Sequence, residues 1–230
     1  MSNESTKTNK VRSQYFFEKY LSGKVLDIGA GNDPVVADSE IFDIKDGNAE
    51  LISNYLPFES YDSVHSSHCL EHMVDPKKAL NEWWKILRNN GYLIITVPHE
   101  DLYEQKIWPP IFNPDHKNTF RINNKTSWSP VSFNILEIIK SLPGAKIIEY
   151  EVHDLNYDYR LQYRRINKIS RRIHRKAHLS SGIKRIFLLL AHHITFNFFQ
   201  VFLSMNKEVL DQTRGDALAQ IQVVAQKAKD

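Results

Sequence analysis

The sequence predicts an α/β fold in which a mostly parallel sheet is covered by helices on both faces. Short apolar runs that suit buried strands alternate with amphipathic stretches that suit helices. The clearest strand is the β-branched run at 92–97, and the clearest helix begins at Asp75-Pro76, a capping carboxylate followed by proline. A glycine-containing turn at 29–31 directly follows an apolar strand. Because ligands of such sheets bind beyond the carboxyl ends of the strands, function is expected there.

The amino-terminal third supplies a helix and three strands. Residues 1–10 are polar, contain no apolar core that would suit a signal peptide, and are predicted to be a flexible tail. Apolar residues recur at helical spacing over 11–21, and Ser22-Gly23 ends that helix. Short apolar runs that end in glycine or polar residues predict strands over 24–28, 40–44 and 61–67.

The central part completes the main domain, which we place at 11–158. The helix that begins at Asp75 has an apolar side, and Asn89-Asn90-Gly91 is expected to end it before the strand at 92–97. Apolar periodicity then predicts a helix over 135–142 and a strand over 145–152. The alternating run 220–225 predicts one more strand, so residues 214–230 should complete the sheet.

Residues 159–213 depart from this alternation and are predicted to form a helical insert. From Arg160 to Arg185 there are ten Lys or Arg residues and no Asp or Glu. Residues 186–203 are apolar but contain two His, one Asn and one Gln, which makes a membrane span costly. Three interpretations stay open: a lid packed on the domain or on a second subunit of a homo-oligomer, a peripheral contact of residues 160–203 with an anionic membrane, and RNA binding.

Composition sets broad limits on the class of protein. The chain has 230 residues, of which 42% are hydrophobic, and a formal net charge of +3, so one well-packed domain with an insert is expected. Its single cysteine, Cys69, cannot form an internal disulfide. That fits the reducing cytoplasm, at the inner face of the membrane if the insert binds lipid.

The turn after the first strand carries the strongest functional signal. Gly29 and Gly31 allow a tight turn and a close approach of the backbone to a ligand. Asp27, two residues ahead, suits a cofactor with an ammonium group and would repel a pyrophosphate. A dinucleotide site would have glycine where Asp33-Pro34 stands. The turn therefore favours an amino-acid-bearing cofactor over NAD.

Two residues near the end of the second strand suit the ribose and adenine groups of such a cofactor. Asp43 lies near the end of the second strand, where a carboxylate can accept hydrogen bonds from ribose hydroxyls, with Asp46 as the neighbouring alternative. The amide of Asn48 follows and suits the edge of an adenine ring.

Several segments in this order resemble the class I methyltransferases, in particular the small-molecule group called type 11. The segments are 25–31, Asp43, 47–50, 61–72 and 87–98. The resemblance runs from about residue 24 to 98, and more loosely to 158. It implies a Rossmann-like sheet with an antiparallel last strand and S-adenosylmethionine (SAM) as the cofactor.

The resemblance also implies cofactor-binding residues, namely Asp27, Gly29, Ala30, Gly31, Asp43, Asn48, Ala49, Ser66, Ser67 and His68. Asp27 would hold the methionine ammonium directly or through water. The residues after it would shape the loop, Asp43 would bind ribose, 48–49 would flank adenine, and 66–68 would close over the methionine end. The chain departs from the family at Asp33, which replaces a loop glycine, and at Asn48, which replaces an acid.

Methyl transfer to a hydroxyl needs positioning and removal of a proton, a role that suits histidine. His99 follows the strand at 92–97, and His116 lies in a proline- and aromatic-rich loop, so we predict both as acceptor-side residues. The Leu-Glu-His segment that contains His72 is mostly structural in the resembled family. A metal set of Asp115, His116, His153 and Asp154 matches no ligand spacing, so no metal site is predicted.

The acceptor is expected to be a small molecule or a glycan. The Asn/Asp-Pro-Pro-aromatic segment of amino-group DNA methyltransferases is missing at 66–68, which argues against nucleic acid. Segment 98–105 resembles methyltransferases found with bacterial surface-polysaccharide genes, which implies a sugar hydroxyl. The alternatives are a quinone or amine acceptor, and a non-catalytic, membrane-associated module that retains only the fold. The intact loop argues against the last alternative.

Overall fold

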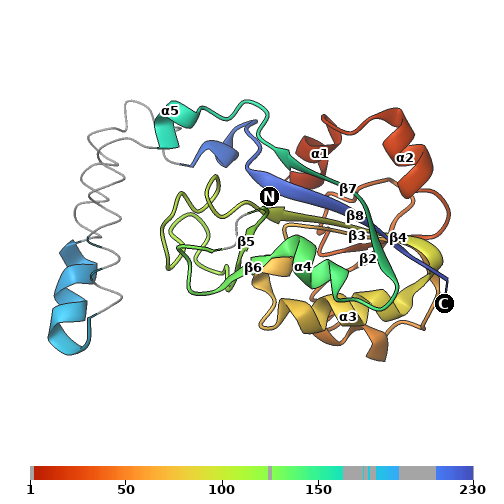
Figure 1. Ribbon diagram of the computed structural model, residues 1–230, viewed down its shortest axis with the longest axis horizontal. Coiled ribbons are helices and arrows are strands. Elements are labelled where there is room, and N and C mark those ends of the chain that lie inside the picture. The colour runs from red at the N-terminus through yellow and green to blue at the C-terminus, as the bar shows by residue number, and fades with distance from the viewer. Residues whose placement is uncertain are drawn as a thin grey trace.

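The computed structural model describes residues 3–123, 126–162, 173, 176, 180–191 and 211–229. Its core is a six-stranded sheet of order β2-β1-β3-β4-β8-β7 (Figure 1). The strands are β1 (Val25–Ile28), β2 (Glu40–Phe42), β3 (Tyr61–Ser67), β4 (Leu87–Pro98), β7 (Ala145–His153) and β8 (Gln220–Lys227). A small parallel sheet pairs β5 (Thr119–Arg121) with β6 (Ser132–Asn134).

The strand directions confirm the predicted α/β, Rossmann-like fold. Strands β1 to β4 run parallel, and β8 runs antiparallel to both β4 and β7. The last strand of the chain is antiparallel, as expected for 220–225, and it lies between β4 and β7. Because β1 to β4 share one direction, their carboxyl ends meet at one edge of the sheet, and the polar segments that follow them gather there.

Helices cover both faces of the sheet, as Figure 1 shows. The helical elements are α1 (Glu4–Asn9), α2 (Gln14–Tyr20), α3 (Pro76–Ile86), α4 (Ile135–Lys140), α5 (Tyr159–Gln162), and the short 3₁₀ turns η1 (Ala49–Asn54), η2 (Leu70–His72) and η4 (Gln212–Arg214). The start of α3 is confirmed, because the Asp75 side chain accepts from the N–H groups of Lys77 and Lys78.

Each face has its own buried cluster. On one side, α3 and α4 pack against the sheet through fully buried side chains such as Trp83 and Ile139. On the other side, Phe16 and Tyr20 of α2 pack against Ile94 of β4. Burial of these large side chains supplies most of the driving force for the sandwich.

The junction between α3 and β4 differs from the prediction. Helix α3 ends at Ile86, and β4 begins at once at Leu87, so Asn89-Asn90-Gly91 lies inside the strand. Tyr61 pairs with Leu87 and Ser63 pairs with Tyr92, so four residues of β4 stand opposite one residue of β3, and three of them are extra. Asn90 has φ +63, which gives the bulge its turn. The sequence Asn89-Asn90-Gly91 is typical of the end of a helix, but in the structure it forms a bulge in a strand.

The amino terminus also differs from the prediction of a flexible tail over 1–10, which is wrong for residues 4–9. These residues form α1, in which Ser5 and Thr8 are buried. Lys7 donates to the carbonyl of Thr213, and Gln220 of β8 donates to the Thr8 hydroxyl. Polar contacts of this kind leave no apolar signature in the sequence.

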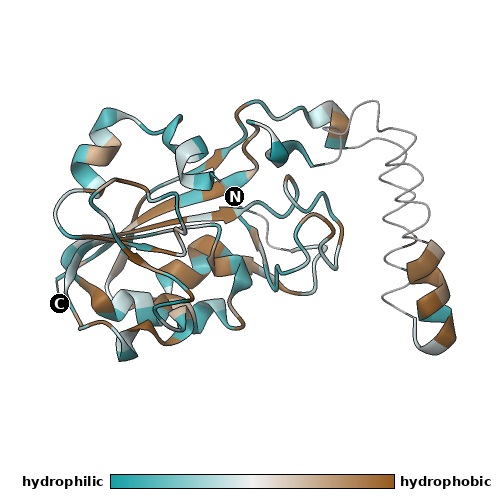
Figure 2. Ribbon diagram, turned by 180° about the vertical axis from the view of Figure 1, so that it is seen from behind, coloured by the Kyte–Doolittle hydropathy of each residue, from teal (hydrophilic) through white to brown (hydrophobic). Residues whose placement is uncertain are grey.

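The described part of the insert is helical at α5 and at residues 182–191. Residues 182–191 stand apart from the sheet in both views, and the hydropathy colouring of Figure 2 shows that most of this helix consists of hydrophobic residues. Ile183, Ile186 and Phe187 are 87%, 67% and 70% exposed. No helix in the described part of the chain is long and apolar enough to cross a membrane. The rest of 163–210, including most of the predicted apolar stretch, lies outside the described residues.

Candidate active site

The glycine turn after β1 lies at the carboxyl edge of the sheet. The chain leaves Ile28 through Gly29 at φ +77 and reaches Gly31 at φ +57, a left-handed conformation that glycine adopts readily. The Gly29 N–H donates to the carbonyl of Phe42 at 2.9 Å, which joins the turn to the end of β2.

The two glycines meet different requirements. A Cβ on Gly29 would lie 2.6 Å from Cys69 Sγ, so packing alone requires glycine there. A Cβ on Gly31 would meet only Asp43 Oδ2, at 3.9 Å, so the space beside Gly31 is open. The Gly31 N–H donates to the same carboxylate oxygen at 3.0 Å. The turn thus leaves room for a ligand next to a carboxylate.

Asp43 is held in place by its own turn. Its Oδ1 accepts from the N–H of Ile44 at 2.8 Å, and its N–H donates to Asp46 Oδ2 at 3.0 Å. Asp46, the alternative ribose ligand, therefore supports Asp43 from the far side of the turn. The structure brings Asp43 to the glycine loop.

Asn48 and Ala49 follow Asp43 and are fixed by the start of η1. The Asn48 side-chain oxygen caps η1 by accepting from the N–H of Glu50 at 2.9 Å. Trp83 of α3 donates from Nε1 to the carbonyl of Ala49 at 2.9 Å. The predicted adenine segment is thereby anchored to the core.

Asp27 is engaged with protein groups rather than presented to the loop. It is 1% exposed, and its Oδ2 accepts from the N–H of Val35 at 2.7 Å, where the glycine loop ends. Its Oδ1 lies 2.7 Å from His65 Nδ1, and Arg12 contacts the other ring nitrogen at 3.1 Å. Burial lowers the pKa of Arg12 to about 10 and also lowers that of His65. In this arrangement Asp27 acts on the loop by tethering it.

The residues at the carboxyl end of β3, and the residue that follows it, occupy the same edge. The Ser66 hydroxyl donates to the carbonyl of Ile28 at 3.1 Å and joins β3 to β1. The Ser67 hydroxyl is buried and has no hydrogen-bond partner in the described part of the chain, so it is an atom that a ligand can satisfy. His68 has φ +52, and its Nε2 contacts Gln220 Oε1 at 2.9 Å.

The two predicted acceptor-side histidines have separate partners. His99 follows β4, is half-buried, and accepts from the N–H of Asp101 through Nδ1 at 3.1 Å, which leaves Nε2 for another group. Burial lowers the pKa of His99, so the ring is neutral near pH 7. His116 is buried, and its Nδ1 lies 2.7 Å from Glu104 Oε1. Burial lowers the pKa of His116 to about 4 and raises that of Glu104 to about 8.

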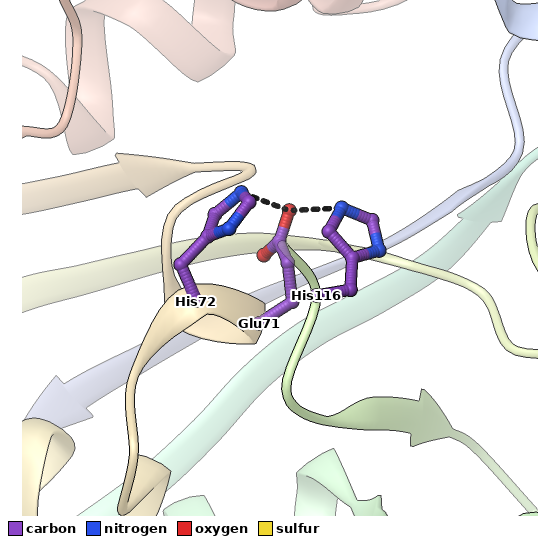
Figure 3. Close-up of side chains that lie close together, drawn as sticks. All are labelled: Glu71, His72 and His116. Atoms are coloured by element: carbon purple, nitrogen blue, oxygen red, sulfur yellow. Dashed lines mark ion pairs between the residues drawn. The ribbon is translucent and has the colours of Figure 1, made fainter. Parts of the chain in front are cut away.

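Glu71 is the residue that the sequence analysis missed. It is 1% exposed, neither of its carboxylate oxygens has a hydrogen-bond partner among the described residues, and burial raises its pKa well above the usual range. His72 Nε2 and His116 Nε2 lie 4.0 and 3.8 Å from Glu71 Oε1 (Figure 3). His68 Nδ1 lies 3.6 Å from the same oxygen. The only sequence signal was Leu70-Glu71-His72, which gives no sign that its glutamate is buried.

A cavity of about 660 Å³ lies under α1, between that helix, Tyr103 and residues 211–216. Its wall includes Glu4, whose carboxylate is 3.8 Å from His68 Nε2. The Tyr103 ring lies 5.1 Å from the ring of His116. The sequence carries no sign of this cavity, because its walls come from segments that lie far apart along the chain.

The comparisons with known proteins agree with this geometry. Residues 26–95 match the family model described as a methyltransferase domain. That segment runs from β1 into β4 and contains the glycine loop and all the predicted cofactor residues. The chain is a SAM-dependent methyltransferase. Its cofactor is accordingly SAM.

Solved structures of other methyltransferases are similar to the chain at low identity. A SAM-dependent methyltransferase from Archaeoglobus fulgidus is 15% identical, with 98% of this chain and 95% of that chain covered and a TM-score of 0.48. A SAM-dependent methyltransferase from Thermotoga maritima is 18% identical, with 65% and 72% covered and a TM-score of 0.41. The search of curated proteins found no match.

Two observations test whether this methyltransferase's residues fit SAM. The position of a Cβ on Gly31 is open, with a carboxylate 3.9 Å away. The buried Ser67 hydroxyl at the end of β3 has no partner among the described residues. An open backbone turn, a nearby carboxylate and an unsatisfied hydroxyl suit a polar ligand with ribose and amino-acid groups, so the residues fit.

Proposed function

We propose that this methyltransferase methylates a hydroxyl group of a small polar acceptor, with a sugar or glycan intermediate of surface-polysaccharide synthesis as the favoured class. The observation that carries the proposal is the open space beside Gly31, next to the Asp43 carboxylate, at the sheet edge where His99 follows β4. This arrangement supports a cofactor site at the glycine turn, with His99 as a titratable side chain for the acceptor at the same edge.

The proposed cofactor site follows the edge from β1 to β3. The turn at Gly29, Ala30 and Gly31 receives the methionine part, with Ser66, Ser67 and His68 closing over it. Asp43 accepts from the ribose hydroxyls, and Asn48 and Ala49 flank the adenine. Asp27 supports the site indirectly, because its carboxylate holds Val35 at the end of the loop.

SAM supplies an already activated methyl group, so the protein mainly positions the acceptor and removes its proton. His99 is proposed for the acceptor side, because its ring is neutral and the Asp101 amide holds Nδ1, which leaves Nε2 to exchange a proton with the acceptor hydroxyl. His116 is buried, and its Nδ1 lies against Glu104, so it is not proposed for the acceptor side.

The cavity under α1 supports a polar, sugar-like acceptor. Its lining is rich in charged and hydroxyl side chains, among them Glu4, Lys7 and Arg214, and it contains one aromatic ring, Tyr103. Such walls suit a molecule with many hydroxyls. A quinone site would be lined mainly by apolar side chains.

The test is methyl transfer from isotopically labelled SAM to a panel of nucleotide sugars, polysaccharide precursors, quinones and amines. Label on a sugar hydroxyl, located by mass spectrometry, is the expected result, and label only on a quinone or an amine would refute the proposed acceptor. Calorimetry with S-adenosylhomocysteine (SAH) on the same sample checks the cofactor site. Absence of SAH binding would favour the non-catalytic alternative.

A further inference from the structure

A cluster of ligand-type side chains lies beside the proposed cofactor edge. Glu71 and His72 come from η2, directly after β3, whereas His116 comes from the loop that precedes β5 (Figure 3). One ligand atom from each of the three residues lies within 4.8 Å of the other two. The Lys117 N–H donates to the Glu71 carbonyl at 2.9 Å, which fastens the two segments together.

Both histidines are oriented by a second carboxylate. His72 Nδ1 lies 3.0 Å from Asp115 Oδ2, and His116 Nδ1 lies 2.7 Å from Glu104 Oε1. In each ring, Nε2 is therefore the atom directed at Glu71. With its hydrogen on Nδ1 and donated to the carboxylate, each ring offers the Nε2 lone pair. Carboxylate–histidine pairs of this kind orient the ligands of protein metal sites.

The centre of the cluster is buried, and its carboxyl oxygens are unsatisfied among the described residues. Neither Glu71 oxygen has a hydrogen-bond partner among the described residues, and Glu104 Oε2 is also unpartnered there. Both glutamates are 1% exposed. Buried carboxyl oxygens of native proteins are nearly always satisfied, so two buried glutamates with unsatisfied oxygens suit a bound cation.

We propose that Glu71, His72 and His116 bind a divalent transition-metal ion of the zinc type. Two imidazoles and one carboxylate favour zinc, cobalt or nickel over magnesium and calcium, which prefer oxygen ligands. Three protein ligands leave a coordination position open. The His72 side chain is 26% exposed, so solvent reaches the cluster from its side. Metal binding does not depend on the nature of the methyl acceptor.

The distances between the ligand atoms allow one zinc ion to be bound after small movements of the side chains. Ligand atoms around a tetrahedral zinc ion at about 2.0–2.1 Å lie roughly 3.3 Å apart. The distances of 3.8 and 4.0 Å from Glu71 Oε1 to the two histidines exceed that value only slightly. His68 Nδ1 lies 3.6 Å from the same oxygen, so the charge of a bound ion would act on the His68 ring.

The experiment titrates the full chain, treated with a chelator, with Zn²⁺ by calorimetry and with Co²⁺ by visible absorption. We expect one equivalent of each metal to bind and the Co²⁺ complex to show the intense bands of a four- or five-coordinate site. Glu71→Gln and His72→Ala should each weaken binding at least about 100-fold, and Glu104→Gln about 10–100-fold. The change at His72 replaces a partly exposed side chain, so it is the variant safest for folding.

His153→Asn is the matched control, because this histidine is buried but lies outside the cluster. The variant should bind Zn²⁺ and Co²⁺ with the affinity of wild type. The proposal is overturned if folded wild type shows no saturable binding, or if His72→Ala and Glu71→Gln bind as tightly as wild type. An equal loss in His153→Asn would also overturn it. SAH calorimetry on each sample separates this result from the proposed function, since the metal and the cofactor have different ligands.

Discussion

Thr6 of α1 donates to Asp33 of the glycine loop through both its N–H, at 3.0 Å, and its hydroxyl. The two residues are 27 positions apart, and Asp33 stands where the resembled family has a loop glycine. The carboxylate that departs from the family pattern is therefore the one that fastens α1 across the proposed cofactor loop. Helix α1 covers this loop and the cavity at the same time.

Thr6→Ala should loosen this cover and speed the release of SAH. The alanine keeps the backbone N–H and loses the hydroxyl, and loss of that one hydrogen bond to a carboxylate is expected to cost about 1 kcal/mol, which corresponds to a roughly fivefold faster dissociation. Stopped-flow displacement of SAH measures the rate. Lys10→Ala is the control, because it removes only the exposed ion pair with Asp216 and should leave the rate unchanged. Equal rates in wild type and Thr6→Ala would show that α1 does not retain the cofactor.

Substitutions at the two loop glycines should separate packing from binding. Gly29→Ala places a methyl group 2.6 Å from Cys69 Sγ at φ +77, so the free energy of unfolding should fall by about 2–4 kcal/mol. Gly31→Ala meets no atom closer than 3.9 Å and should lower it by only about 1 kcal/mol, yet weaken SAH at least about tenfold. Urea denaturation and calorimetry measure the two effects. Full SAH affinity in Gly31→Ala would refute a cofactor at this turn.

Local patterns in the sequence were enough to predict the sheet. β3 was predicted with its observed bounds, and α3 was predicted from its Asp75-Pro76 start, because burial and capping leave direct traces in residue type. The strand bulge at 88–91 was mistaken for a helix stop, since Asn and Gly favour both turns and bulges.

The candidate site could be predicted less completely. Gly29, Gly31 and Asp43 were placed at one edge because strand ends converge there. The partners of Asp27 depend on His65 and Arg12, which approach it only in the folded chain. Glu71 and Thr6 were missed for the same physical reason: burial of a carboxyl group and contacts between distant polar residues leave no periodic pattern.

The buried His65 should make the stability of the protein depend on pH. Burial lowers its pKa below the usual value of about 6.5, so below that pH the unfolded chain binds a proton that the native chain does not. Stability from this group is present above pH 6.5 and falls as pH decreases, by up to about 1.4 kcal/mol per unit. His65→Asn should therefore lose less stability than wild type between pH 7.5 and 5.5 in urea denaturation. Equal losses would show that His65 is protonated in the native state.

His99→Gln should slow methyl transfer without weakening the cofactor. Loss of a positioned base is expected to lower kcat about 10²–10⁴-fold, while the SAH affinity stays within twofold, since the proposed cofactor residues lie elsewhere. Because burial lowers the His99 pKa, wild-type kcat should hold at neutral pH and fall only in acid, as the ring becomes protonated. A decrease in SAH affinity equal to that in kcat would make His99 a cofactor residue instead.

The helix at 182–191 should bring the protein to anionic membranes. Its Ile186 and Phe187 side chains are 67% and 70% exposed, and the ten basic residues between Arg160 and Arg185 precede or overlap it. Apolar side chains beside clustered positive charge favour an interfacial contact. Sedimentation with phosphatidylserine vesicles at low salt should capture wild type, with capture reduced several-fold by Phe187→Ser or by high salt, and absent with neutral vesicles. Tyr55→Ser, which changes an exposed aromatic residue after η1, is the control and should sediment like wild type. Failure of wild type to sediment, together with a concentration-dependent dimer, would assign this surface to a second copy of the chain.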